Sequence, residues 1–375
     1  MKRINIGLFS LMLLGVLFSC SKASLDYTQN GNWVSRAIFK GVPMAFGTSF
    51  VLNGSAYVGT GYNPNTPNNR LKTFYQYTPS PLTGGGATGY DSAYGGWSQI
   101  ADFGGAGRSN ATGFAIKSAG FGYVGTGTSD GFTPLSDFWQ YDPNANQWKE
   151  IDSLNNGSTN FPRFDASSFS MDTAGYVLTG TDGNYFFGDV WKYSPTAKAW
   201  TQDANDMPGS KRSAAVTWVY NGVGYLVTGL TPGSQYVAGG NVCYDFWKYD
   251  PSIQLPKSQW VRLRDIYNTN AASTYDDGYT NIVRQHAVGF VITGTNTGDK
   301  GYITTGQNGA LYNFTWEYDF ASDLWTEKTP YEGAARQGAV GFNIGARGFV
   351  TTGLGSAAND DLREFFPNQI YNQYD

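Results

Sequence analysis

Apolar and polar residues alternate along most of this chain, in short runs separated by Gly, Pro and Asn. A period of two is typical of β-strands, and no stretch of comparable length shows the 3.6-residue period of a helix. Six runs share one pattern, in which a Gly or Ala, an aromatic residue and an aliphatic residue lead into Thr-Gly. They begin at Ala56, Gly122, Gly175, Gly224, Gly301 and Gly348. This pattern predicts a nearly all-β chain built from repeats.

Each repeat has further fixed positions. An Arg opens the apolar run that precedes five of the Thr-Gly runs, at Arg108, Arg163, Arg212, Arg284 and Arg336. An Asp-x-Trp-x-Tyr stretch follows three of them, beginning at Asp137, Asp189 and Asp245. An isolated Trp closes five units, at Trp97, Trp148, Trp200, Trp260 and Trp325. These closing Trp residues are 51 to 65 positions apart, so each unit has room for four short strands.

Four-stranded units at this spacing resemble the kelch repeats of β-propellers. The resemblance implies an all-β fold: a six-bladed kelch-like β-propeller with four antiparallel strands per blade. Two features depart from kelch blades, because Thr-Gly replaces their usual Gly-Gly and the last unit, Asp361–Phe365, has no closing Trp. Trp33, upstream of the first unit, can supply that position. We therefore expect the N-terminal strand to close the ring, without a free sheet edge, in one domain over residues 31–375.

The first twenty residues form a separate segment. Two basic residues precede an apolar run that is too short to span a bilayer and ends in Leu17-Phe18-Ser19-Cys20. This ending resembles a bacterial lipobox, which implies a lipoprotein signal peptide over 1–20, a lipid on Cys20 and a tether over 21–30. Cys20-Ser21-Lys22 loosely resembles the surface-export tether of some Bacteroidetes lipoproteins, so either side of the outer membrane is open. The alternative is an ordinary secretory signal in which Cys20 is incidental.

Composition excludes several classes of function. Only 14% of residues are charged and the formal net charge is −4, so we expect no nucleic-acid partner. The chain has a single His, His286, and Cys243 is the only Cys besides Cys20. A site with several His or Cys ligands cannot form from these, so we expect no metal and no cofactor. Galactose oxidase has a kelch-type propeller, but its copper centre needs two His and a linked Cys-Tyr pair, so copper-oxidase activity is not expected for this chain.

The repeated Arg has two interpretations. In a four-stranded blade, the loop between the second and third strands and the connection into the next inner strand lie on one face, which we call the mouth face. The five arginines should gather there around the central channel and, with Gln285 and His286, could hold a carboxylate or a sugar acid. Alternatively, a residue found in five blades serves the blade itself, by pairing with a carboxylate such as Asp137, Asp189 or Asp245. His286 could equally be a hydrogen-bonding residue at the start of an inner strand.

Two long insertions are expected on the mouth face, at residues 230–244 and 261–283. They contain Tyr236, Tyr267, Tyr275 and Tyr279. Aromatic rings can stack on sugar rings, and Tyr-rich loops also suit protein recognition. A third insertion, residues 78–96, should lie on the opposite face and is rich in Gly, Ser and Pro, which favours a plain loop.

Two classes of function remain. The first is a non-catalytic cell-envelope lipoprotein whose propeller binds a protein or a glycan on the mouth face. The second is a periplasmic carbohydrate-active enzyme, such as a sugar epimerase or mutarotase, or a lyase, with its site at the channel mouth. An enzyme of this kind needs a general acid and a general base that converge on the channel. The sequence identifies no such pair, and the fold alone does not choose between the two classes.

Overall fold

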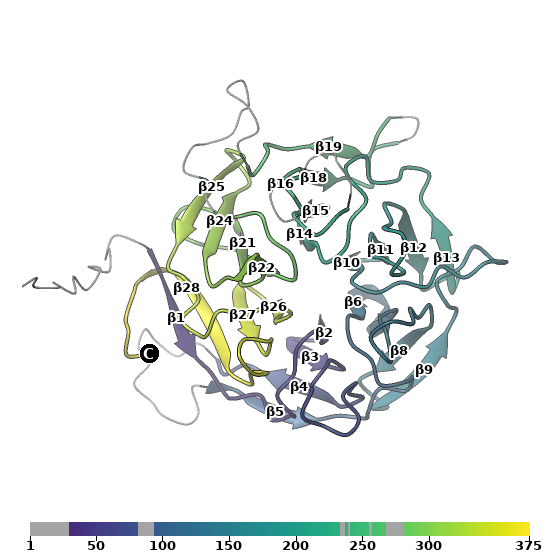
Figure 1. Cartoon of the computed structure of the whole chain (residues 1–375), viewed down its shortest axis with the longest axis horizontal. Helices are drawn as coiled ribbons and strands as arrows, with labels where there is room; N and C mark the ends of the chain where they lie inside the picture. The colour runs from purple at the N-terminus through teal and green to yellow at the C-terminus, as the bar shows by residue number, and fades with distance from the viewer. Residues whose placement is uncertain are drawn as a thin grey trace, which may run out of the picture.

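The computed structural model describes residues 30–81, 94–232, 237–238, 241–254, 257–267, 279 and 281–375. These residues form six four-stranded antiparallel sheets arranged as blades around a central axis (Figure 1). The expected all-β, six-bladed propeller is confirmed. Helical structure in the described residues is confined to short 3₁₀ turns such as η2 (Lys117–Ala119), and none of their helices is long and apolar enough to cross a membrane.

In each blade the first strand lines the channel and the fourth is outermost. The first blade contains β2 (Thr48–Leu52), β3 (Ser55–Gly59), β4 (Phe74–Thr78) and β5 (Gly96–Gln99). The second contains β6 (Thr112–Ile116), β7 (Phe121–Gly125), β8 (Phe138–Asp142) and β9 (Gln147–Ile151). The third contains β10 (Ser167–Met171), β11 (Ala174–Leu178), β12 (Val190–Ser194) and β13 (Ala199–Gln202).

The remaining three blades follow the same order. The fourth contains β14 (Val216–Tyr220), β15 (Val223–Val227), β18 (Phe246–Tyr249) and β19 (Trp260–Arg262). The fifth contains β20 (Val288–Ile292), β21 (Lys300–Thr304), β24 (Thr315–Asp319) and β25 (Leu324–Lys328). The sixth contains β26 (Val340–Ile344), β27 (Arg347–Thr351), β28 (Leu362–Ile370) and β1 (Asn30–Ser35). Two short ribbons, β16–β17 (Val237–Ala238 and Val242–Cys243) and β22–β23 (Gln307–Asn308 and Ala310–Leu311), belong to the mouth face.

The N-terminal strand closes the ring, as expected. β1 is the outermost strand of the sixth blade and pairs antiparallel with β28, with Trp33 opposite Phe365 (Figure 1). The Trp33 ring is fully buried, 4.7 Å from the ring of Phe365 and 4.9 Å from that of Tyr331. The two ends of the chain are therefore held in one sheet.

Aromatic stacking explains the Gly-aromatic pattern. In every blade the aromatic residue of the inner strand stacks on that of the second strand, for example Phe114 on Tyr123 at 5.3 Å. The other pairs are Phe50–Tyr57, Phe169–Tyr176, Trp218–Tyr225, Phe290–Tyr302 and Phe342–Phe349. The neighbouring blade must leave room for this stack. A Cβ atom on Gly175 would lie only 1.9 Å from Phe114, so Gly precedes the aromatic because the blades approach closely.

The closing Trp residues fill equivalent positions in all six blades. Each packs on the aromatic residue of the third strand, with ring centroids 4.7 to 5.1 Å apart. The pairs are Trp97–Tyr77, Trp148–Tyr141, Trp200–Tyr193, Trp260–Tyr249, Trp325–Tyr318 and Trp33–Phe365. Trp33 is thus the closing Trp of the sixth blade.

Candidate functional site: the mouth face and the central channel

The blade-opening arginines are structural. Arg108, Arg163 and Arg212 pair with Asp137, Asp189 and Asp245, which confirms the second of their two interpretations. Arg336 makes the same pair with Asp361 of the last unit. All five arginine side chains are at most 1% exposed, so the expected ring of guanidinium groups around the mouth is not available to a ligand.

The same Arg also joins neighbouring blades. Nη1 of Arg163 donates to the carbonyl of Thr179 in its own blade at 2.9 Å, and its backbone carbonyl accepts from Gly127 of the preceding blade at 2.8 Å. The blade-to-blade bond occurs six times and forms a closed ring. Its donors are Gly61, Gly127, Gly180, Gly229, Gly306 and Gly353, and its acceptors are Arg108, Arg163, Arg212, Arg284, Arg336 and Met44. Arg, Thr-Gly and Asp therefore form one structural unit.

Two blades depart from this unit. In the first blade, Met44 and Thr73 occupy the Arg and Asp positions, so both charges are lost together. In the fifth, Phe314 replaces the Asp while Arg284 stays fully buried. Arg284 instead donates to backbone carbonyls, including those of Ile282 at 2.8 Å and Thr305 at 2.8 Å. Burial without a carboxylate partner lowers the pKa of this guanidinium.

A second ring of backbone hydrogen bonds encircles the channel at the mouth. The residue two positions before each inner strand has a positive φ, between 50° and 59°. Its N–H donates to the equivalent carbonyl of the preceding blade. These six residues, which we call the mouth ring, are Phe46, Asn110, Asp165, Ala214, His286 and Gly338. The six bonds measure 2.7 to 3.2 Å and run around the whole axis. They lock the blades in place at this end of the channel.

Four side chains of the mouth ring contact one another across the axis. Nδ2 of Asn110 donates to Oδ1 of Asp165 at 2.6 Å, and Nε2 of His286 lies 3.2 Å from the same oxygen. The His286 ring packs edge-on against Phe46 at 5.1 Å. Both ring nitrogens of His286 are buried. His286 thus contributes to a cluster of side chains across the channel, which we call the plug.

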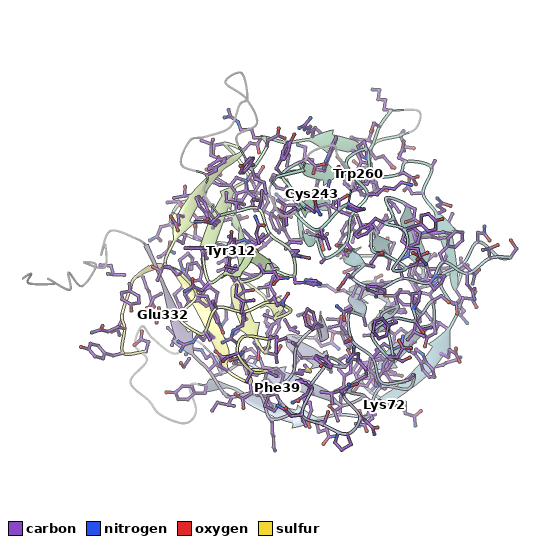
Figure 2. All side chains as sticks on the ribbon, viewed as in Figure 1. Phe39, Lys72, Cys243, Trp260, Tyr312 and Glu332 are labelled. Atoms are coloured by element: carbon purple, nitrogen blue, oxygen red, sulfur yellow. The ribbon has the colours of Figure 1, made fainter. Side chains whose placement is uncertain are left out.

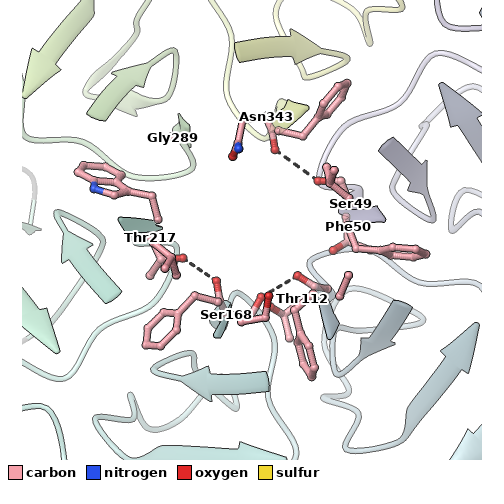
Figure 3. Close-up of a pocket in the computed structure, with 18 of the residues that line it drawn as sticks. Ser49, Phe50, Thr112, Ser168, Thr217, Gly289 and Asn343 are labelled. Atoms are coloured by element: carbon pink, nitrogen blue, oxygen red, sulfur yellow. Dashed lines mark hydrogen bonds between the residues drawn. The ribbon is translucent and has the colours of Figure 1, made fainter. Parts of the chain in front are cut away.

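A cavity of about 760 Å³ runs along the axis behind the plug. It is lined by the inner strands of all six blades and reaches their hairpin turns on the opposite face, at Gly54 and Gly222 for example. Figure 3 shows Ser49, Ser168, Thr217, Gly289 and Asn343 around this open centre, while the ring of Phe50 points away from it. Lys117 and Asp172 are the titratable residues of its described lining, and both are exposed at the outer rim.

The channel lining is explained by contacts between blades. Ser168 and Thr217 donate to backbone carbonyls of the preceding inner strand, both at 2.8 Å, and Ser49 does the same at 3.3 Å (Figure 3). Where the equivalent residue is Gly, the preceding inner strand lies too close for a side chain. A Cβ atom on Gly289, for instance, would lie 2.5 Å from Val216. Small and hydroxyl-bearing residues at these positions serve packing of the ring.

The four candidate tyrosines have different positions. Tyr267 is 43% exposed, and its ring lies 6.4 Å from that of Tyr244. Tyr279 is only 3% exposed, and its hydroxyl accepts a hydrogen bond from the backbone N–H of Trp325 at 2.7 Å. As a candidate binding residue, Tyr279 therefore offers no exposed ring to a ligand. Tyr236 and Tyr275 lie outside the described residues.

Gln285 and Cys243 are held by the fold. The backbone of Gln285 pairs with that of Gln307 in the ribbon of the fifth blade, with hydrogen bonds of 2.9 and 3.0 Å. Cys243 is buried in the short β16–β17 ribbon between the second and third strands of the fourth blade (Figure 2), and burial raises the pKa of its thiol to about 12. A thiol in this state is unreactive at neutral pH. Among the described residues, no group of three or more His, Cys, Asp or Glu side chains is placed to hold a metal ion.

Two exposed aromatic residues on the mouth face belong to no sequence pattern. Phe132 and Tyr185 lie in the turns between the second and third strands of the second and third blades, which have ordinary lengths and did not stand out. Residues 127–131 also fit Gly-x-Ser-x-Gly. They form part of a strand-to-strand turn, however, and not the strand-to-helix turn that exposes a nucleophilic Ser in hydrolases.

Comparison with solved structures supports the fold alone. The structure of YjhT is similar to this chain with a TM-score of 0.61 and 16% sequence identity, over 88% of this chain and 96% of that one. No protein-family model matches the chain, and no curated protein matches it. The similarity to kelch repeats therefore stays a prediction from the sequence.

Proposed function

We propose that this protein is a non-catalytic, lipid-anchored component of a bacterial cell envelope whose propeller binds a glycan or a protein on its mouth face. The observation that supports this most directly is the state of the candidate catalytic groups. The five arginines are buried inside the blades, and both nitrogens of His286 are buried in the plug. General acid–base catalysis needs such groups within hydrogen-bonding distance of a substrate.

The channel gives little support to the enzyme alternative. Its described lining consists of hydroxyl, amide, apolar and glycine positions, apart from Lys117 and Asp172 at the exposed rim. A mutarotase, epimerase or lyase would need an acid and a base that face each other across a bound sugar. The mouth face, in contrast, projects loops from a rigid ring, an arrangement common to binding scaffolds.

The proposed location depends on Cys20. A lipid on this residue would hold the propeller at the outer membrane, on its periplasmic or its outer side, by a tether over residues 21–30. The strand β1 begins at Asn30, so the tether would join the propeller at the sixth blade.

A combined binding and turnover screen tests the function. Residues 24–375, which contain all six blades, are applied to a glycan array, incubated with sialic acid and other reducing sugars to follow mutarotation, and used for cross-linking to envelope proteins. Saturable binding without turnover supports the proposal. Turnover that survives in the presence of a chelator would favour the enzyme class. If no glycan on the array binds and no envelope protein is cross-linked, the binding function is contradicted.

A further inference from the structure

The mouth face presents two aromatic rings that the blades do not need. Phe132 is 83% exposed and Tyr185 is 71% exposed, although burial of such rings normally contributes to folding. Each lies in a mouth hairpin, the turn between the second and third strands, at residues 128–134 of the second blade and 181–186 of the third. We propose that these two rings form a platform for a neutral polysaccharide chain that crosses the neighbouring blades. This inference rests on the binding function proposed above.

Hydrogen bonds hold the hairpin of the second blade in shape although its tip is exposed. Oδ1 of Asp130 accepts hydrogen bonds from the backbone N–H groups of Phe132 and Thr133, at 2.8 and 2.7 Å. The hydroxyl of Thr133 donates to Oδ2 of Asp130 at 2.8 Å, and that of Thr128 accepts from Gly131 at 2.8 Å. The backbone N–H groups of Thr133 and Phe132 lower the pKa of Asp130, so it stays ionised and the turn persists at neutral pH.

The third blade repeats the same construction. Oδ1 of Asp182 accepts from the backbone N–H groups of Asn184 and Tyr185, at 2.8 and 2.7 Å. The hydroxyl of Thr181 donates to the carbonyl of Tyr185 at 2.7 Å and accepts from Gly183 at 3.0 Å. In both blades an Asp holds the backbone of the exposed aromatic residue. A ligand would therefore meet rings whose backbone is already ordered, which reduces the entropy lost on binding.

The first blade supports this platform from the side. The guanidinium of Arg70 lies 4.3 Å above the ring of Tyr62 and approaches Gly131, where an added Cβ atom would lie 2.7 Å from Nη2. Burial lowers the pKa of Arg70 and is the larger effect. The nearby carboxylate of Asp130 raises this pKa and partly offsets the lowering. Arg70 thus packs against the tip of the second-blade hairpin.

The surroundings of the rings favour a polysaccharide. Both rings are largely exposed, so the platform is an open surface and not a pocket for a small molecule. The two tips, residues 129–133 and 182–185, contain only polar residues and Gly apart from their rings. The centre of a protein interface, in contrast, is apolar and poor in charged residues. Isolated rings among hydroxyl, amide and carboxylate groups match a sugar chain, because its C–H faces stack on rings and its hydroxyl groups bond the polar neighbours.

Affinity electrophoresis of the purified full chain in detergent provides the test. The gels contain β-glucan, arabinoxylan, galactomannan or starch, and melting temperatures check that each variant is folded. We expect at least one polysaccharide to retard the protein. Phe132→Ala and Tyr185→Ala should each weaken that binding about tenfold or more, as truncation of an interface anchor does, and the double variant should lose it. Tyr185→Phe keeps the ring, and Tyr374→Ala removes a ring that is 85% exposed near the C-terminus, so both should bind normally.

Three results would overturn the inference. Unchanged binding by the double variant would place the glycan elsewhere on the propeller and leave the binding function intact. A photo-crosslinking residue at position 132 that captures an envelope protein in place of sugar would make the platform a protein interface. Failure of all four polysaccharides to retard the wild-type chain would contradict the platform. Only if the glycan array and protein cross-linking also failed would the proposed function itself be lost.

Discussion

Nη2 of Arg212 donates to both carboxylate oxygens of Asp245, at 2.6 and 2.5 Å, and neither side chain is exposed. This ion pair is the most deeply buried of the four repeated pairs, since the carboxylate side chains of Asp137, Asp189 and Asp361 are 12% to 32% exposed. Removal of one partner would leave the other charge buried without compensation, which costs far more than the pair contributes.

Single and double substitutions at this pair should therefore behave differently. Asp245→Ala should lower the free energy of unfolding by about 3–5 kcal/mol, because the guanidinium of Arg212 is left unpaired. The double variant Arg212→Met with Asp245→Thr copies the pair that the first blade has at Met44 and Thr73, and it should lose much less. Urea unfolding of the three proteins measures this. A double variant as unstable as Asp245→Ala would show that the charges themselves are required.

The closing strand supplies the second prediction. Trp33 is fully buried between Phe365 and Tyr331, and its indole N–H donates to the carbonyl of Thr329 at 3.2 Å. Trp33→Ala should lower the free energy of unfolding by about 3–5 kcal/mol. Deletion of residues 26–40 removes β1 and exposes the edge of β28, so aggregation should follow. Light scattering and thermal melting measure both effects, and a monomeric deletion variant with an unchanged melting temperature would refute closure by β1.

The role of Trp33 could be predicted because one unit of the repeat lacked its closing Trp. Five units had a closing Trp, the sixth did not, and an unused Trp preceded the first unit. The Arg–Asp pairs could be proposed for the same reason, since a repeated pair of opposite charges suggests a contact within each blade. Repetition thus predicts scaffold well.

The local direction of individual side chains could not be predicted. The length of the insertion that contains Tyr267 and Tyr279 does not indicate which of its rings are exposed. The ring of Tyr267 is partly exposed, whereas Tyr279 packs beside Trp325. The plug at His286 depends on a positive φ of 50°. Asn, Asp and His adopt this conformation more often than other non-Gly residues, but it stays uncommon, so one His residue does not predict it. Phe132 and Tyr185 went unnoticed because a single aromatic residue in a short turn is common.

Alkaline pH should destabilise the propeller. Burial raises the pKa of Tyr141, Tyr176 and Tyr225 to about 12, above the value near 10 of an unfolded chain. The folded state therefore holds these protons more tightly, and this stability is fully present below about pH 10 and is lost as the pH rises toward about 12. The midpoint of unfolding in guanidinium chloride, determined at a series of pH values together with tyrosinate absorbance, measures the loss of stability. Tyr176→Phe should flatten the pH dependence, and a midpoint independent of pH between about 9 and 11 would contradict the mechanism.

Lipidation at Cys20 is a separate prediction. Cys20→Ser should abolish metabolic labelling with a fatty acid and move the protein from the membrane fraction to the soluble fraction. The physical reason is that acyl chains provide stable anchoring to a bilayer, which the charged and polar tether that follows does not. Ser21→Ala serves as the control, because it changes the next residue and keeps the thiol. Membrane association that survives Cys20→Ser would mean that this Cys is incidental.

The mouth ring yields a contrast between two equivalent positions. Gly338 and Ala214 both have a positive φ, 59° and 50°, but a Cβ atom on Gly338 would lie 2.5 Å from the ring of Phe46. Gly338→Ala should lower the free energy of unfolding by about 1–3 kcal/mol, because it adds left-handed strain and a clash. Ala214→Gly removes strain that is already present, so it should leave the stability within about 0.5 kcal/mol or raise it. Urea unfolding of both variants decides the matter. Equal losses at the two positions would mean that the ring does not depend on left-handed backbone geometry.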